Sequence, residues 1–201
     1  MIARRWLGSW LAVMLLACAV SGFARDCPHA QDPSPLIAPP AATDVPSVEV
    51  FFSPWDDAQQ RLLQVLADAC EQVLVQAFVL TSRDVADGLV AARQRGVDVR
   101  VLADARQHAD TPASLLPKLV KAGIPVWLED RYRHAHNKVM LIDVYSQSPI
   151  IVTGSYNFTW SAQHRNAENL LIIRGHSAIA DRYAKNWARH QSDATPLTVL
   201  P

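Results

Sequence analysis

The sequence predicts an α/β fold in which a mixed, largely parallel β-sheet is sandwiched between helices. Short apolar runs alternate with helix-spaced apolar patterns along residues 48–192, and no internal repeat interrupts the alternation. Such alternation is typical of a sheet with helices on its faces. Half of the 201 residues are hydrophobic, which is enough for one substantial core.

Each expected element has its own local signal. Apolar runs predict strands at residues 48–52, 72–80, 97–103, 124–128, 139–142, 150–153 and 170–173. Helix starts are expected at Ser53-Pro54, Ser82 and Thr111-Pro112, because a capping residue, twice with a following proline, favours a helix N-terminus. A last helix is expected at residues 176–190, with Ile179, Tyr183 and Trp187 on one stripe.

The chain divides into four expected segments. Residues 1–24 are expected to be a signal peptide, because two arginines precede an uncharged apolar run and small residues end at Ala24. Residues 25–47 are rich in Pro and Ala and are expected to form an arm or linker. Residues 48–192 would then be the folded domain, and residues 193–201 a C-terminal tail.

The signal peptide predicts an exported protein, either periplasmic or secreted. An uncleaved anchor and a lipoprotein cleavage box at Cys18 are the alternatives. In an oxidising compartment Cys27 and Cys70 could pair, whereas a free buried Cys70 and a mobile Cys27 are the alternative. The formal net charge of zero weakens an argument for nucleic acid, but local basic patches can still bind phosphates.

The stretch from His136 to Asn169 carries the chemistry of the chain. His136 and Lys138 are two residues apart, so a strand would direct both side chains to one face. Asp143 has the opposite parity, and we expect it to have a structural role at the end of that strand. The pattern therefore predicts an imidazole beside an ammonium group.

The polar groups that follow suit a phosphate. Gly154 allows a positive φ or a close backbone approach, and Ser155 and Asn157 offer a hydroxyl and an amide to a ligand oxygen. Lys138 would supply positive charge, and His136 supplies a nitrogen that can attack phosphorus or transfer a proton.

The neighbours of His136 suggest two further roles. Glu168 is a candidate to hold the second ring nitrogen, which would fix the tautomer and stabilise positive charge on the ring. His134 and His136 also form H-x-H, a metal-ligand spacing that Asp143 or Asp130 could complete. Lys138 on the same face would repel a cation, so no metal is expected.

The pattern H-x-K-x4-D followed by G-S-x-N resembles the HKD motif of the phospholipase D superfamily, and is most similar to the short bacterial endonucleases with one motif per chain. The resemblance runs from about Val48, through FFSP, RGVDVRVLAD and AGIPV, to about Ile173. It implies a phospholipase D-like nuclease domain with metal-independent chemistry and no cofactor. One departure is the link between Asp143 and Gly154, which is longer than the family usually allows and is expected to lengthen a hairpin turn.

The motif and its surroundings together give the candidate site. The candidate catalytic residues are His136, Lys138, Asp143 and Glu168, and the candidate substrate-binding residues are Ser155, Asn157, His134 and Arg133. Arg131 and Arg133 lie close to the motif, which favours a groove for a polyanionic backbone, with an ordinary solvated loop as the alternative.

A single motif does not complete the reaction. One histidine cannot easily attack phosphorus and protonate the leaving oxygen on the opposite side, and the sequence contains no second H-x-K. The resemblance likewise implies a homodimer with the site on its two-fold axis. The expected function is a low-specificity endonuclease that acts on nucleic acid, most naturally DNA, through a phosphohistidine, without stable membrane association after signal cleavage. A phospholipid-hydrolysing phospholipase D and a non-catalytic nucleic-acid-binding module are the alternatives.

Overall fold

The computed structural model describes residues 46–198. They form one eight-stranded sheet with the order β1-β7-β6-β5-β2-β3-β4-β8. The strands are β1 (Ser47–Ser53), β2 (Gln72–Ala77), β3 (Asp98–Asp104), β4 (Val126–Glu129), β5 (Lys138–Ile142), β6 (Ile150–Gly154), β7 (Glu168–Arg174) and β8 (Thr195–Pro196). The helices are α1 (Ala58–Ala67), α2 (Arg83–Gln94), α3 (Ala105–Ala109), α4 (Leu116–Lys121), α5 (Trp160–His164) and α6 (Ser177–Asp193).

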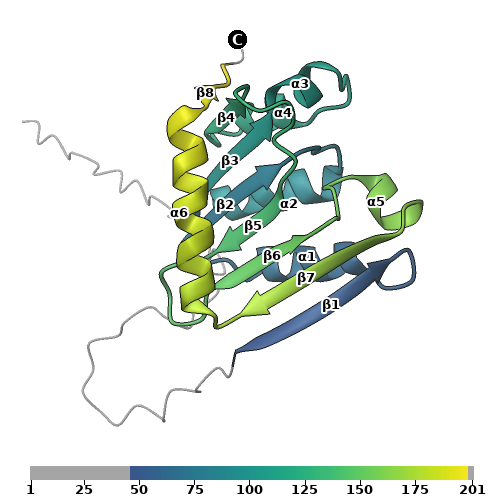
Figure 1. The fold of residues 1–201 in the computed structure, drawn as a ribbon, viewed down its shortest axis with the longest axis vertical. Coiled ribbons are helices and arrows are strands. Elements are labelled where there is room, and N and C mark those ends of the chain that lie inside the picture. The colour runs from purple at the N-terminus through teal and green to yellow at the C-terminus, as the bar shows by residue number, and fades with distance from the viewer. Residues whose placement is uncertain (1–45, 199–201) are drawn as a thin grey trace, which may run out of the picture. The chain divides into compact units, whose positions relative to one another are not determined.

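The sheet lies between helices, as the sequence predicts (Figure 1). One face packs against α1, α2 and α4 in the larger apolar cluster, in which Leu62, Leu89 and Leu119 are fully buried. The other face packs against α6, whose Ala180, Ala184 and Trp187 contact the smaller cluster. Two hydrophobic layers therefore hold the central strands in place.

The balance of strand directions differs from the expectation. Among the strand pairs of the described residues, only β2–β3 and β3–β4 are parallel, whereas the remaining five are antiparallel. The mixed sheet is confirmed, but it is not largely parallel. The reason is that β5, β6 and β7 follow one another through connections without a long crossover helix, which favours antiparallel neighbours.

Several element boundaries also differ. The expected helix start at Ser53-Pro54 is wrong, because α1 begins at Ala58 and Asp57 accepts a hydrogen bond from the Gln60 N–H as its cap. Similarly, α4 begins at Leu116 rather than at Thr111-Pro112. The last helix buries Ala180, Ala184 and Trp187, so the expected stripe is displaced and Ile179 is exposed.

The two ends of the chain differ in how far the structure describes them. The expected tail contributes β8, which pairs with β4 at one edge of the sheet. The expected signal peptide, most of the arm and Cys27 lie outside the described residues. Cys70 is disulfide-bonded, and its pairing with Cys27 stays a prediction. Among residues 46–198, none of the helices has the length and apolar character to cross a membrane.

Candidate active site

His136 and Lys138 meet at the start of β5, as their spacing predicts. The Lys138 ammonium donates to Nδ1 of His136 and to the His136 carbonyl oxygen, each at 2.8 Å. Lys138 is buried beside β2, where it pairs with Ala77, while His136 is exposed. A buried ammonium thus stands against an imidazole that a ligand can reach.

The surroundings of His136 favour its neutral form. Partial burial lowers the pKa of His136 most, and the charges of Lys138 and His134 lower it further, while the Asp104 carboxylate opposes them. The ring is accessible to solvent, yet Phe78 excludes water from one side at a centroid distance of 4.2 Å. A neutral imidazole keeps a nitrogen lone pair, which a nucleophile or base requires.

Phe78 is a site residue that the sequence analysis missed. It follows β2, its ring lies 4.2 Å from the His136 ring, and the Lys138 ammonium stands 4.9 Å from its centroid. Its backbone N–H donates to the Asn137 carbonyl oxygen at 2.9 Å, which fixes the strand end beside the motif. The sequence places Phe78 inside the expected strand of residues 72–80, whereas β2 ends at Ala77, and only the strand order makes Phe78 a neighbour of His136.

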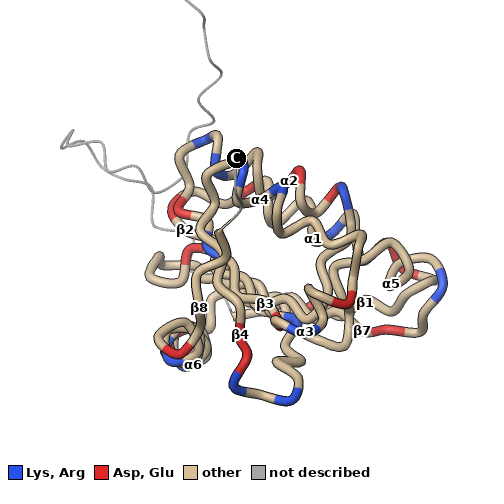
Figure 2. Tube along the Cα trace, turned by 90° about the horizontal axis from the view of Figure 1, so that it is seen from above, with Lys and Arg blue, Asp and Glu red and all other residues tan. Residues whose placement is uncertain are grey.

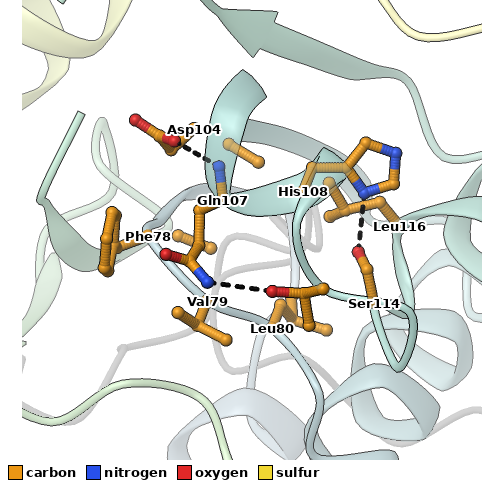
Figure 3. Close-up of a pocket in the computed structure, with 11 residues that line it drawn as sticks. Phe78, Val79, Leu80, Asp104, Gln107, His108, Ser114 and Leu116 are labelled. Atoms are coloured by element: carbon orange, nitrogen blue, oxygen red, sulfur yellow. Dashed lines mark hydrogen bonds between the residues drawn. The ribbon is translucent and has the colours of Figure 1, made fainter. Parts of the chain in front are cut away.

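Asp104 is a second residue that the analysis missed, although it ends the quoted RGVDVRVLAD segment. Its buried carboxylate accepts from the N–H of Gln107 at 2.7 Å, which caps α3, and from the N–H of Ala135 at 2.6 Å. Ala135 lies between His134 and His136, so one carboxylate fixes the backbone of the loop that carries both histidines. Figure 3 shows Asp104 beside Gln107, with Phe78 on the same side of a small hollow.

The hollow in Figure 3 lies between the end of β2 and the segment that follows β3. His108 Nδ1 contacts the Ser114 hydroxyl at 2.8 Å, and burial lowers the pKa of His108. Gln107 donates from its amide to the Thr111 hydroxyl at 2.9 Å. These side chains satisfy one another's hydrogen-bonding groups, so they form an ordered side of the hollow beside Phe78.

The G-S-x-N segment forms the opposite side of the site. Gly154 has a φ of 145°, and a Cβ there would lie 2.3 Å from the Asn169 carbonyl oxygen, so both glycine expectations hold. The Ser155 hydroxyl accepts from the Asn169 N–H at 3.0 Å, which places Asn169 in the same group. Asn157 has a buried side-chain oxygen without a hydrogen-bond partner among the described residues, so this oxygen can accept one further hydrogen bond.

Glu168 begins β7 and lies close enough for its charge to raise the pKa of Lys138, against a larger lowering by burial. Its Oε1 accepts from the Asn166 amide at 2.9 Å. Within one chain, the described contacts include no hydrogen bond between Glu168 and His136. The orientation of His136 by Glu168 therefore stays a prediction.

Asp143 lies at the far end of β5 from His136. Its carboxylate accepts from three consecutive backbone N–H groups, of Cys70 at 2.9 Å, Glu71 at 2.7 Å and Gln72 at 2.8 Å. Asp143 also has a φ of 49°, an uncommon value outside glycine. The structure separates this motif residue from the reacting group, and its contacts match the structural role that its parity predicts rather than its place among the candidate catalytic residues.

The basic loop after β4 is divided between two roles. Arg131 pairs with Asp193 of α6 at 2.8 Å, and the Tyr132 ring stacks on His190 at 5.1 Å, so these residues anchor the loop. Arg133 and His134 are exposed, and the His134 ring approaches Phe78 edge-on at 6.0 Å. Figure 2 shows basic positions on the outer part of this loop, beyond the acidic end of β4.

The described residues, 46–198, contain no group of three or more His, Cys, Asp or Glu side chains placed to hold a metal ion. The H-x-H spacing of His134 and His136 is therefore not joined there by a third such ligand.

Comparison with known proteins gives a consistent result. Residues 62–190 match the family described as cardiolipin synthase, PLD-like domain. A phospholipase D of Rickettsia prowazekii is 35% identical over 141 residues, which are 70% of this chain and 66% of that protein. A mitochondrial cardiolipin hydrolase of Chlamydomonas reinhardtii is 30% identical over 139 residues, 68% of this chain and 60% of that protein.

A solved structure supports the same grouping. Nuc from Salmonella typhimurium, a phospholipase D family member, matches with a TM-score of 0.72 and 29% identity, over 77% of this chain and 100% of that one. The family match covers more than half of the chain and contains the His136–Lys138 pair, the G-S-x-N segment and Glu168. The chain therefore belongs to the phospholipase D superfamily.

Proposed function

We propose that this protein is an exported, metal-independent phosphodiesterase that hydrolyses nucleic-acid phosphodiester bonds as a homodimer. The observation that carries the proposal is the contact between His136 and Lys138, a nitrogen nucleophile held beside a buried cation. Ser155 adds a hydroxyl, and Asn157 adds a side-chain amide whose N–H groups can donate to a phosphate oxygen. These groups suit the tetrahedral oxygens of a phosphodiester.

The first half of the reaction forms a phosphohistidine. A ring nitrogen of His136 attacks phosphorus, the P–O bond to the leaving group breaks, and the leaving oxygen takes a proton from His136 of the partner subunit. In the structure the Lys138 ammonium donates to the His136 ring. The negative oxygens of a bound phosphate would compete with the ring for this ammonium group. When the Lys138 ammonium donates to the phosphate instead, Nδ1 of His136 is free to carry the ring hydrogen. Glu168 is the proposed acceptor of a hydrogen bond from this N–H group.

The second half restores the enzyme. His136 of the partner subunit takes a proton from water, the water oxygen attacks phosphorus, and the P–N bond to His136 breaks. Ser155 and Asn157 hold the phosphoryl oxygens through both halves. Lys138 offsets their negative charge within a site that is partly shielded from water.

The exposed residues around the site favour nucleic acid over phospholipid. Arg133 and His134 extend from the loop after β4 and can contact neighbouring phosphates. Trp160 is half exposed, with the Arg165 guanidinium 5.0 Å from its ring, and could stack on an unpaired base. A phospholipid substrate is the second candidate, because the relatives named phospholipase D and cardiolipin hydrolase share the domain.

The test is cleavage of supercoiled plasmid in excess EDTA by the wild type, His136→Ala and the control His176→Ala. His176 precedes α6 at the end of β7 that is remote from Glu168, so its loss should leave nicking unchanged. We expect wild-type nicking to persist in EDTA and His136→Ala to reduce its rate by at least about 10⁴-fold. Loss of wild-type nicking in EDTA would contradict the metal-independent mechanism, and near-normal nicking by His136→Ala would contradict the assigned nucleophile.

A parallel assay separates the two substrate classes. Wild-type protein that leaves plasmid, single-stranded DNA and RNA intact, but hydrolyses cardiolipin in vesicles to phosphatidic acid and phosphatidylglycerol, would overturn the nucleic-acid proposal in favour of the phospholipid candidate.

A further inference from the structure

The loop between β4 and β5 has few backbone hydrogen bonds to hold it. It spans residues 130–137 and carries the proposed nucleophile near its end. The Ala135 N–H donates to the Asp104 carboxylate, and the Asn137 carbonyl oxygen accepts from the residue that follows β2. Within the part of the chain that the structure describes, no hydrogen bond reaches the backbone of residues 131–134. This half of the loop is therefore held by its side chains.

Two of these side chains reach the last turns of α6. The Arg131 guanidinium pairs with the Asp193 carboxylate at 2.8 Å. The Tyr132 ring lies against the His190 ring, with centroids 5.1 Å apart and planes inclined by 33°. Figure 1 shows the C-terminal end of α6 (yellow) beside β4, from which the loop departs. Solvent screens the exposed ion pair, so we assign the larger share of the hold to the ring contact.

His190 is itself fixed by a buried carboxylate. Its Nδ1 contacts Oε1 of Glu129, which ends β4. Burial raises the pKa of Glu129 most, the contact with His190 lowers it, and the neighbouring Asp104 charge raises it again. Within residues 46–198, His190 is the only side chain that hydrogen-bonds this carboxylate. The ring that Tyr132 contacts is thus tied to the strand from which the loop begins.

The contact between Glu129 and His190 adjoins the carboxylate that holds the other half of the loop. Asp104 and Glu129 are register partners on β3 and β4, so their side chains lie on one face of the sheet. Asp104 accepts from the N–H of Ala135, directly before His136, at 2.6 Å. The two halves of the loop are therefore anchored at adjacent buried carboxylates, one through a backbone hydrogen bond and the other through α6.

We infer that His190 is a positioning residue for His136, acting through its contacts with Glu129 and Tyr132. The inference rests on the proposed function, in which His136 attacks phosphorus in line with the leaving oxygen. A displacement of about 1 Å can slow such an attack on the order of a hundredfold. The helix is a rigid support for this purpose, because Trp187, one turn before His190, is buried and donates to a carbonyl oxygen of β2 at 3.0 Å.

Four variants of the full-length chain test the inference. His190→Ala removes both contacts, and Tyr132→Ala removes only the ring contact of a side chain that is 41% exposed, so the fold tolerates it. Tyr132→Phe keeps the ring. The matched control is His176→Ala, because His176 is also half-buried but stands at the opposite end of α6. Circular dichroism and urea unfolding identify the conditions under which each variant is folded.

The first readout is kcat and KM for the small phosphodiester bis(p-nitrophenyl) phosphate in excess EDTA. We expect His190→Ala and Tyr132→Ala each to lower kcat at least about tenfold, with KM within about threefold of the wild type. Tyr132→Phe and His176→Ala should keep the wild-type values. The double variant should be no slower than the slower single variant, since the two side chains act through one contact.

Two kinetic outcomes would overturn the inference. One is an unchanged kcat in folded His190→Ala and Tyr132→Ala, because a purely structural contact would change the unfolding free energy and leave the turnover of folded protein intact. The other is a double variant in which the two losses multiply, because Tyr132 would then act on the substrate independently of His190.

The second readout, limited trypsin digestion, separates this inference from the proposed function because it needs no turnover. Arg133 provides a cleavage site within the loop. Cleavage there, identified by mass spectrometry, should be faster in His190→Ala and Tyr132→Ala than in the wild type and His176→Ala. Equal rates in all four proteins would overturn the inference. A wild type that hydrolyses no phosphodiester, but whose loop is cleaved faster in the two variants, would refute the proposed function while supporting the hold of α6 on the loop.

Discussion

Replacement of Asp143 should affect stability rather than chemistry, although Asp143 belongs to the sequence motif. Its carboxylate accepts from the N–H groups of Cys70, Glu71 and Gln72 at 2.7 to 2.9 Å. These bonds join the end of β5 to the segment that starts β2, its antiparallel neighbour. None of them reaches His136, which lies at the other end of β5.

The size of the effect follows from these contacts. A net contribution of about 1 kcal/mol for each bond gives about 3 kcal/mol for the three bonds lost in Asp143→Ala. The φ of 49° adds about 1 kcal/mol, because alanine tolerates the left-handed region poorly. Asp143→Asn keeps that tolerance and one oxygen, and Oδ1 alone accepts from Glu71 and Gln72, so its cost should be about 1 to 2 kcal/mol.

The assay compares urea unfolding with plasmid nicking for the wild type, Asp143→Ala and Asp143→Asn at one protein concentration. We expect the unfolding free energy to be highest for the wild type, lower for Asp143→Asn and lowest for Asp143→Ala, while the nicking rate of folded protein stays within about threefold of the wild type. The reasoning would be refuted if Asp143→Ala kept wild-type stability but lost nicking as severely as His136→Ala.

Three further changes have directions fixed by the structure. Gly154→Ala combines a positive φ with a backbone clash and should cost about 2 to 4 kcal/mol in urea unfolding, more than Gly96→Ala, where φ is 95° and nothing lies within 4 Å of the added Cβ. His134→Gln removes a charge that lowers the pKa of His136, so the acid limb of kcat/KM against pH should move to higher pH. Asp104→Asn can keep the α3 cap but removes a charge that raises the same pKa, so that limb should move to lower pH.

Comparing the two glycine variants, and the two charge variants, tests the physical reasons behind these predictions. Equal costs for the two glycine variants would contradict the backbone clash. The acid limb reports the neutral form of the attacking histidine, which is populated above its pKa, and this pKa lies below the ordinary value of 6.5. Shifts of the limb in one common direction for the two charge variants would contradict the assigned electrostatics.

The sequence predicts those parts of the fold whose signals are local. Seven of the eight strands coincide with apolar runs, and Ser82 caps α2 as expected. The missed helices α3 and α5 have five residues each, too few for a helical pattern, and depend on the capping side chains of Asp104 and Thr159. The false helix start at Ser53-Pro54 arose because Asp57, four residues after Ser53, supplies the actual cap.

The candidate site also contains residues that local patterns predict and residues that they do not. The contact between His136 and Lys138 follows from strand parity within three residues, and the close approach at Gly154 follows from glycine chemistry. Phe78 and Asp104 could not be assigned, because their places beside the histidine loop depend on β5 lying next to β2 and β2 next to β3. Strand order is a property of the whole chain, and no local pattern specifies it.

The contacts of Asp143 also fix the position of the disulfide-bonded residue Cys70. The Cys70 N–H is the first of the three donors to the Asp143 carboxylate. Asp143 stands seven residues from His136, on the order of 20 Å along an extended strand. The disulfide at Cys70 therefore lies at the end of β5 that is remote from His136, and we expect a reductant that opens it to leave the contact between His136 and Lys138 unchanged.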